Sequence, residues 1–217
     1  MRRLIGRLRP FTLRKMLALA AVIVLAGGTV WAIKEYRHYL HAANFYVVEP
    51  GSFLRGARQN PYMLRKIIEE HHIRAIVNLD DKVLERQDLD RPDADPYEAE
   101  KALAKEHGIQ YYGFIWQGSG VGPYEEYDEV ADILASPANR PVFLHCAAGE
   151  KRTNAALAAY WIRHCGYTLD QAVQGLIPYG LSPSRKREFV DHLRGYYDYT
   201  KSHPRSGVSA PPAPTHP

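Results

Sequence analysis

A cysteine and an arginine separated by five residues form the pair best suited to chemistry in this 217-residue sequence. Residues 141–153 read P-V-F-L-H-C-A-A-G-E-K-R-T, so Cys146 opens a short polar loop and Arg152 closes it. A thiolate is the reactive, nucleophilic form of cysteine, and the planar guanidinium group of arginine can bind two oxygen atoms of a phosphate. The pair therefore predicts attack of sulfur on a phosphate ester.

The segments on either side of this loop are expected to position it. The apolar run at 142–145 predicts a buried strand, and the alanine-rich run at 153–164 predicts a helix. Main-chain N–H groups that converge ahead of a helix N-terminus stabilise an anion, first the thiolate and then the phosphate. The candidate phosphate-binding residues are Ala147, Ala148, Gly149, Glu150, Lys151 and Thr153.

Three loop residues have more specific expected roles. Gly149 suits a backbone position that needs a positive φ or a close approach of another chain segment. The hydroxyl group of Thr153 can donate a hydrogen bond to the sulfur of Cys146, and His145 can orient the loop. We therefore expect Cys146 and Arg152 to be the catalytic pair, with these three residues supporting them.

The rest of the chain alternates apolar runs with helical patterns. Such alternation predicts an α/β fold with a central, mainly parallel sheet flanked by helices. Two late helices are expected to begin at N-cap residues, one at Thr168 and one at Ser182 or Ser184. The other expected strands are 45–48, 53–55, 75–79 and 109–115, and the other expected helices are 61–72, 96–107 and 124–135.

The loop from Cys146 to Thr153 resembles the signature loop of the cysteine-based protein tyrosine phosphatases. The stretches FLRGARQ (53–59), IVNL (76–79), HGIQYY (107–112) and NRPVFLHC (139–146) occur in the order expected for that superfamily. They are most similar to its compact dual-specificity branch, particularly the atypical members in plants, fungi and bacteria. The resemblance covers roughly residues 44–196.

This resemblance implies a sheet of four or five strands and a phosphocysteine intermediate. It implies neither a metal ion nor another cofactor. The expected substrate is a phosphate monoester, either on a phosphorylated protein, with phosphotyrosine or dual specificity, or on a small phosphate ester such as an inositol phosphate.

Relatives in this superfamily carry an aspartate on a loop roughly 30 residues before the cysteine, where it protonates the leaving oxygen. The corresponding stretch here, FIWQGSGVGP at 114–123, contains no carboxylate. Three explanations stay open: Glu150 is the acid, Asp80 or Asp81 at a strand end is the acid, or the leaving group needs none. The missing carboxylate also favours an alternative function, a membrane-tethered module that binds phosphate or phosphoprotein with weak turnover.

An apolar segment near the N-terminus predicts a membrane anchor. Residues 16–33 form a run of 18 uncharged residues, the lower limit for a transmembrane helix. Six Lys/Arg residues precede the run, so the positive-inside rule places residues 1–15 in the cytoplasm and the domain on the periplasmic side of an inner membrane. The alternative is a cleaved signal peptide that releases a secreted protein, although Trp31 disfavours the cleavage site.

The chain divides into five parts by composition. These are a basic cytoplasmic N-terminus (1–15), an anchor (16–33), a linker (34–43), a phosphatase domain (44–200) and a Pro-rich tail (201–217). The tail is expected to be disordered, and it offers a partner-binding segment as a further alternative.

The net charge of +4 comes from the N-terminal part of the chain. Residues 1–40 hold eight basic and one acidic side chain, whereas residues 41–217 hold 20 basic and 23 acidic side chains. A net negative domain excludes nucleic acid as the expected partner. Two cysteines are too few for a disulfide framework, and nothing in the sequence indicates an oligomeric state.

Overall fold

The structure is a computed structural model that describes residues 13–80 and 96–204, and the chain divides into two units, 1–40 and 41–217. The first unit contains one helix, α1 (Leu13–Leu40), which continues through most of the segment expected to be a linker. Its residues Lys15–Ile33 have a mean hydropathy of 2.3 and are exposed. By length and composition, this 19-residue segment is able to cross a membrane.

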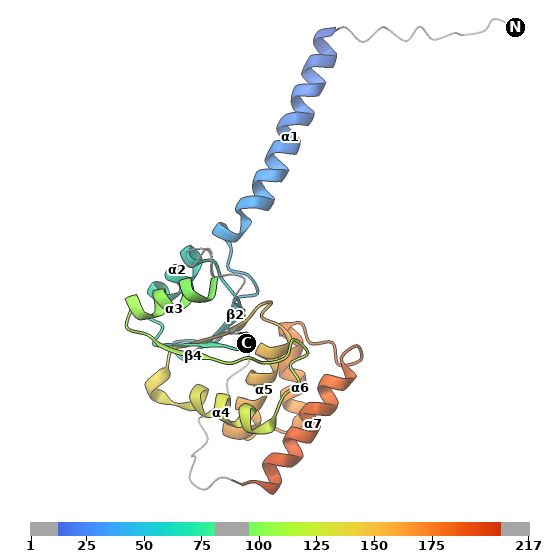
Figure 1. The fold of residues 1–217 in the computed structure, drawn as a ribbon. Helices are drawn as coiled ribbons and strands as arrows, with labels where there is room; N and C mark the ends of the chain where they lie inside the picture. The colour runs from blue at the N-terminus through green and yellow to red at the C-terminus, as the bar shows by residue number, and fades with distance from the viewer. Residues whose placement is uncertain (1–12, 81–95, 205–217) are drawn as a thin grey trace, which may run out of the picture. The chain divides into compact units, whose positions relative to one another are not determined.

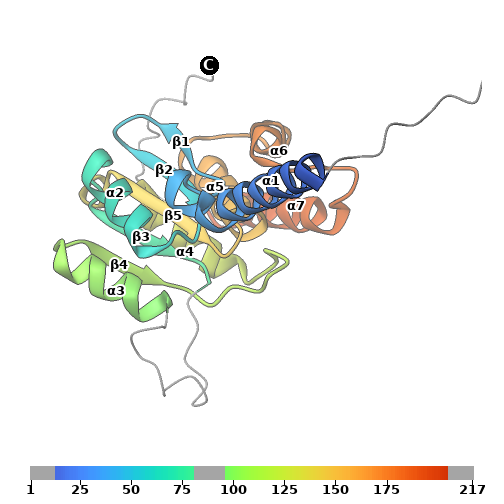
Figure 2. The same cartoon turned by 90° about the horizontal axis from the view of Figure 1, so that it is seen from above.

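A five-stranded sheet lies at the centre of the second unit (Figures 1 and 2). Its order is β1-β2-β5-β3-β4. Strands β1 and β2 form an antiparallel hairpin, and all other neighbours are parallel, as the alternation of strands and helices predicts. The strands are β1 (Tyr46–Glu49), β2 (Phe53–Ala57), β3 (Ala75–Asn78), β4 (Gln110–Gly113) and β5 (Val142–Cys146).

Helices cover both faces of this sheet. Helices α2 (Pro61–His71) and α3 (Pro96–Glu106) pack on one face (Figure 1). The opposite face is covered by α4 (Tyr124–Ala135), α5 (Lys151–His164), α6 (Leu169–Leu176) and α7 (Arg187–Ser202). Two apolar cores result, one on each side of the sheet.

The alternation of side chains along β5 decides which core each residue joins. Phe143 packs on the side of α2 and α3, while Leu144 and Cys146 belong to the core on the side of α5. Successive side chains of a strand point to opposite faces, so the even-numbered positions of β5 share one face. This register delivers the thiol of Cys146 to the start of α5.

Local capping explains where several helices begin. Asn60 caps α2 by accepting a hydrogen bond from the Met63 amide, and Pro61 occupies the first turn. Thr168 and Gln171 form a capping box at α6, which confirms the expected start of that helix.

The expected N-cap of α7 at Ser182 or Ser184 is wrong. The main-chain carbonyl of Ser182 accepts hydrogen bonds from the amides of Arg185 and Lys186, both at 3.0 Å. These bonds close a turn over residues 182–186, and α7 begins only at Arg187. The helix therefore starts after this turn, and neither serine caps it.

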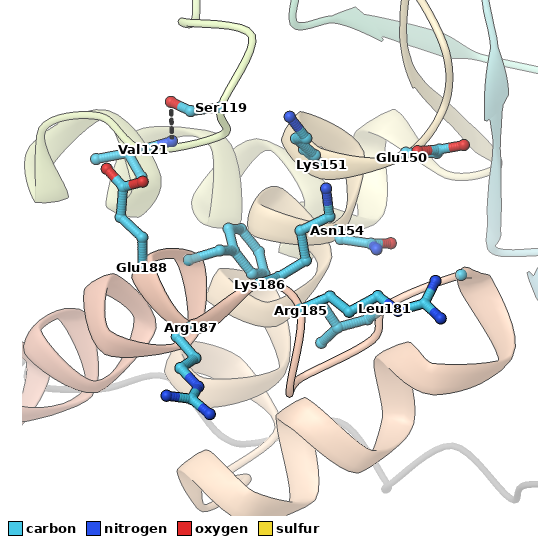
Figure 3. Close-up of a pocket in the computed structure, with 12 residues that line it drawn as sticks. Ser119, Val121, Glu150, Lys151, Asn154, Leu181, Arg185, Lys186, Arg187 and Glu188 are labelled. Atoms are coloured by element: carbon cyan, nitrogen blue, oxygen red, sulfur yellow. Dashed lines mark hydrogen bonds between the residues drawn. The ribbon is translucent and has the colours of Figure 1, made fainter.

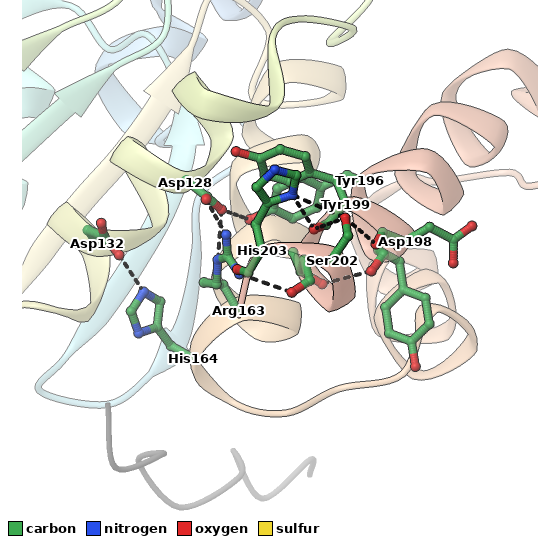
Figure 4. Close-up of polar contacts among 11 residues, drawn as sticks. Asp128, Asp132, Arg163, His164, Tyr196, Asp198, Tyr199, Ser202 and His203 are labelled. Atoms are coloured by element: carbon green, nitrogen blue, oxygen red, sulfur yellow. Dashed lines mark hydrogen bonds and ion pairs between the residues drawn. The ribbon is translucent and has the colours of Figure 1, made fainter. Parts of the chain in front are cut away.

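A buried polar cluster fixes α7 against α4 and α5 (Figure 4). The carboxylate of Asp128 on α4 accepts hydrogen bonds from Arg163 Nε at 2.8 Å and from the Tyr196 hydroxyl at 2.7 Å. Beside this cluster, Asp132 and His164 share a hydrogen bond of 2.9 Å. Buried polar groups that satisfy each other in this way hold packed helices in one register.

Candidate active site

The loop between β5 and α5 lies at the ends of three adjacent parallel strands. Cys146 is the last residue of β5 and is paired with Ala57 at the end of β2, and His145 is paired with Asn78 at the end of β3. Helix α5 begins at Lys151, two residues before its expected start, so Arg152 lies in its first turn. The C-terminal ends of parallel strands are where open α/β sheets place their ligands.

Donors outside the loop hold its carbonyl groups. With the carbonyl oxygens held by these donors, the loop amides can point toward its interior, and the amides of Glu150 and Thr153 contribute to lowering the pKa of the Cys146 thiol. The external donors are Arg58 N to Cys146 O at 2.8 Å, Asn44 Nδ2 to Ala148 O at 2.7 Å, and the Arg55 guanidinium group to Gly149 O.

The thiol of Cys146 is 2% exposed. Burial raises its pKa, but hydrogen bonds from the hydroxyl and amide of Thr153, the charge of Arg152 and the Glu150 amide bring the pKa below its usual value. The hydroxyl oxygen of Thr153 lies 3.2 Å from the sulfur, as the sequence predicts. The surroundings of the buried sulfur therefore favour the thiolate form more than an ordinary cysteine environment does.

Gly149 is the position in the loop where only glycine fits. Its φ is +67°, and a Cβ atom placed there would lie 2.4 Å from the carbonyl carbon of Gly56 and 2.5 Å from the amide nitrogen of Ala57. Both reasons given by the sequence for a glycine, a positive φ and a close backbone approach, hold here. The loop thus lies directly on the end of β2.

Arg152 is oriented by Asp80, at the end of β3. The guanidinium group of Arg152 donates to Asp80 Oδ1 and, at 3.3 Å, to the carbonyl of Trp116. The other carboxylate oxygen of Asp80 accepts from Arg58 at 2.6 Å, and Arg58 lies 4.1 Å from the centre of the Tyr97 ring. Asp80 therefore links two cations at the mouth of the loop.

The three carboxylates considered as general acids have different positions. Both oxygens of Asp80 are engaged by guanidinium groups. The side chain of Glu150 is exposed, and Asp81 lies outside the described residues. Of the two described carboxylates, Asp80 therefore orients guanidinium groups and Glu150 faces solvent.

Residues 114–123, the segment without a carboxylate, lie against the start of α5. The ring of Trp116 stacks on Tyr127 at 4.8 Å, and the Tyr127 hydroxyl donates to the carbonyl of Gly120. A Cβ atom at Gly120 would lie 2.9 Å from the carbonyl oxygen of Lys151. The backbone of this segment is thus in close contact with the start of α5.

Arg55 was missed from the sequence, although it lies directly behind the loop. It is fully buried, donates to Asn154 Oδ1 and Gly149 O, and lies 4.5 Å from the centre of the Tyr179 ring. Burial lowers its pKa to about 10. A charged residue inside the apolar strand pattern FLRGA was the signal that could have identified it.

His145 also has a partner that the sequence did not suggest. Its Nε2 atom lies 2.7 Å from a carboxylate oxygen of Glu100 on α3, and both side chains are buried. This side-chain contact fixes the ring at the end of β5, while the role of His145 in orienting the loop through its backbone contacts stays a prediction. Within residues 13–80 and 96–204, no group of three or more His, Cys, Asp and Glu side chains is arranged to hold a metal ion.

Comparison with solved structures identifies the fold. P. aeruginosa TpbA is 19% identical, with a TM-score of 0.56, over 74% of this chain and 90% of that chain. The core catalytic domain of the PP-IP phosphatase SIW14 from S. cerevisiae is 17% identical, with a TM-score of 0.51, over 75% and 93%. PTPMT1 is 14% identical, with a TM-score of 0.52, over 73% and 99%.

No family model matches the sequence, and no curated protein matches it. The structural similarity spans nearly the whole length of each solved chain. It confirms the resemblance to the compact branch of the cysteine-based phosphatases at the level of the fold.

Proposed function

We propose that this domain, which has the fold of the cysteine-based tyrosine and dual-specificity phosphatases, hydrolyses phosphate monoesters through a phosphocysteine intermediate. The observation that carries the proposal is the loop from Cys146 to Arg152, in which the thiol accepts a hydrogen bond from the Thr153 hydroxyl and has a pKa lowered by Thr153, by the charge of Arg152 and by the Glu150 amide. Such a ring of donors suits first a thiolate and then a tetrahedral phosphate.

In the first step, the Cys146 thiolate attacks phosphorus as the bond from phosphorus to the ester oxygen breaks. Loop amides and the guanidinium group of Arg152 stabilise the charge on the equatorial oxygens. In the second step, water attacks the phosphocysteine, the sulfur–phosphorus bond breaks, and inorganic phosphate and the thiolate are released. The oxyanion that leaves in the first step must also gain a proton.

The source of that proton limits the substrates. Residues 114–123 supply no carboxylate, and Asp80 is engaged by Arg58 and Arg152. Leaving groups that are stable as anions are therefore favoured, so aryl phosphates such as phosphotyrosine should react faster than alkyl phosphates such as phosphoserine. Among the structural neighbours, TpbA was crystallised in complex with pTyr and PTPMT1 in complex with PI(5)P.

The full chain in detergent, assayed with p-nitrophenyl phosphate, tests this function. Cys146→Ser should abolish hydrolysis while the protein still binds vanadate, and an acid quench of wild type during turnover should trap a phosphorylated protein. Cys165→Ser is the matched control, because Cys165 lies at the far end of α5, and it should keep wild-type activity. Hydrolysis that survives in Cys146→Ser would overturn the mechanism.

The second candidate function is a phosphate-binding or phosphoprotein-binding module with weak turnover. The absence of a carboxylate from residues 114–123 favours it. A rapid-quench experiment separates the two functions. One equivalent of released alcohol per protein in a fast burst supports the enzyme, and tight binding of vanadate without any burst supports the module.

We further propose that the segment 15–33 of α1 anchors the protein in a membrane with the catalytic domain on the periplasmic side. The proposal is supported by the exposed apolar surface of this segment and by the basic residues that precede it in the sequence. Release after signal cleavage is the alternative.

A further inference from the structure

A cavity lies beside the loop from Cys146 to Arg152, called the phosphate loop below (Figure 3). Its volume is about 240 Å³. One wall is formed by Glu150, Lys151 and Asn154, which belong to the end of the loop and the first turns of α5. The opposite wall is the segment 180–189, which leads into α7. Glu150 and Lys151 belong to the loop that begins at Cys146, so the cavity adjoins that loop.

The lining of the cavity holds more positive than negative charge, with four basic residues (Lys151, Arg185, Lys186 and Arg187) and two acidic ones (Glu150 and Glu188). Lys151, Arg185 and Lys186 line it, and within residues 13–80 and 96–204 none of these three side chains forms an ion pair. In Figure 3 the side chain of Lys186 extends toward Asn154 and Lys151, whereas Glu150 points away from them. Like charges that face one another in this way repel, and a bound anion would remove the repulsion.

The lining of the cavity also contains the side-chain amide of Asn154 and three apolar side chains. Asn154 is 3% exposed, and its amide nitrogen has only a long contact, 3.5 Å, with the carbonyl of Tyr179. The apolar side chains of Val121, Leu181 and Phe189 complete the lining. A buried amide donor between cations and apolar groups suits an anionic group carried on a small organic body.

We infer that this cavity binds a second phosphate group of the substrate while the first phosphate lies in the loop at Cys146. The inference rests on the proposed function and narrows it to small esters that carry two or more phosphates. Phosphate suits the cavity because its oxygens can accept hydrogen bonds from the ammonium groups of Lys151 and Lys186, which line it.

Steady-state kinetics with two matched substrates test the inference. Phenyl phosphate carries one phosphate, and 1,3-phenylene bisphosphate carries two on the same ring. We expect wild type to have a higher kcat/KM for the bisphosphate, by about tenfold after correction for its two reactive groups. Lys186→Gln and the double variant Arg185→Gln/Lys186→Gln should reduce that preference by about threefold and about tenfold, and leave kcat/KM for phenyl phosphate unchanged.

Lys105→Gln is the control for net charge. Lys105 is exposed on α3, on the opposite face of the sheet, so its removal changes the charge of the domain without touching the cavity. This variant should keep the full preference. The preference of wild type should also weaken as salt is raised, because partly exposed charges are screened.

The possible failures are distinguishable. Equal kcat/KM values for both substrates in wild type would overturn the second phosphate site and leave the phosphatase intact. A preference that Lys186→Gln and the double variant both keep would do the same. A preference lost equally in Lys105→Gln would also overturn it, because the effect would then be one of overall charge. If neither substrate is hydrolysed, the proposed function itself fails.

The second phosphate site is then tested by binding to the Cys146→Ser protein. Pyrophosphate must bind to this protein more tightly than phosphate does, and adding Lys186→Gln must remove that difference in affinity.

Discussion

The sulfur of Cys146 is buried, so its reactivity depends on a few neighbouring atoms. Burial alone raises the pKa of a thiol, and the donors around the sulfur together with the charge of Arg152 bring it below its usual value. The hydroxyl of Thr153, at 3.2 Å, is the side-chain donor among them. Replacing that one group should therefore change the charge state of the nucleophile while the rest of the loop keeps its shape.

Thr153→Val should raise the pKa of the Cys146 thiol. The hydroxyl stabilises the thiolate, so its loss makes the thiolate less populated at any pH below the new pKa. The acid limb of the kcat/KM profile should then move to higher pH, and alkylation by iodoacetamide at pH 6 should slow by about tenfold. Thr153→Ser keeps the hydroxyl and should retain the wild-type profile. An unchanged acid limb in Thr153→Val would show that the amides alone hold the thiolate.

Sequence reasoning found the residues of the site that are neighbours in the chain and missed most of those that are not. Cys146, Arg152 and Thr153 form one motif, so their spacing alone predicts their contact. Arg55 contacts Asn154 across 99 residues, and Glu100 contacts His145 across 45. Such pairs depend on strand order and on how helices pack, and no local pattern in a single sequence specifies them.

Among the secondary-structure elements, the phosphate loop and strand β2 are in close backbone contact at Gly149. A methyl group at Gly149 would overlap the backbone of Gly56 and Ala57, which cannot move without disturbing the pairing of β2 with β5. The loop thus keeps its shape because a strand lies directly beneath it.

Gly149→Ala should destabilise the domain by about 2–4 kcal/mol, since it adds overpacking to the cost of a positive φ. Urea denaturation measures this change. Gly108→Ala is the matched control, because Gly108 has a φ of +66° with open space around its Cα, and it should cost only about 1 kcal/mol. Equal losses in the two variants would show that the backbone conformation alone matters and that β2 can move aside.

Elements were predicted well where periodicity and caps agree. The helix at 124–135 and the capped start of α6 follow directly from apolar spacing and from Thr168. The start of α7 was misplaced because the serines that suggested a cap lie in a turn, and the turn is stabilised by main-chain hydrogen bonds to Ser182 O. Main-chain hydrogen bonds of this kind depend little on side-chain type, so they cannot be predicted from the sequence.

At the scale of the whole molecule, the apolar segment 15–33 is the feature on which the proposed membrane anchoring depends. We expect the protein to remain with membranes after carbonate extraction, because an exposed apolar helix of this length partitions into the bilayer. Protease added to spheroplasts should remove the catalytic domain, as the positive-inside rule predicts. A shorter protein in the soluble periplasmic fraction would indicate signal cleavage, and protection of the domain in intact spheroplasts would reverse the topology.

The strand order β1-β2-β5-β3-β4 also constrains when the molecule can fold. Strands β2 and β3 do not pair with each other. Strand β5, the last of the five strands in the chain, lies between them and joins the two halves of the sheet. Until residues 142–146 are available, a nascent chain therefore has two unconnected half-sheets and no nucleophile. A chain threaded through a translocon in an extended form would stay unfolded until most of it had crossed, and sheet closure would then complete the architecture and the reactive centre in one event.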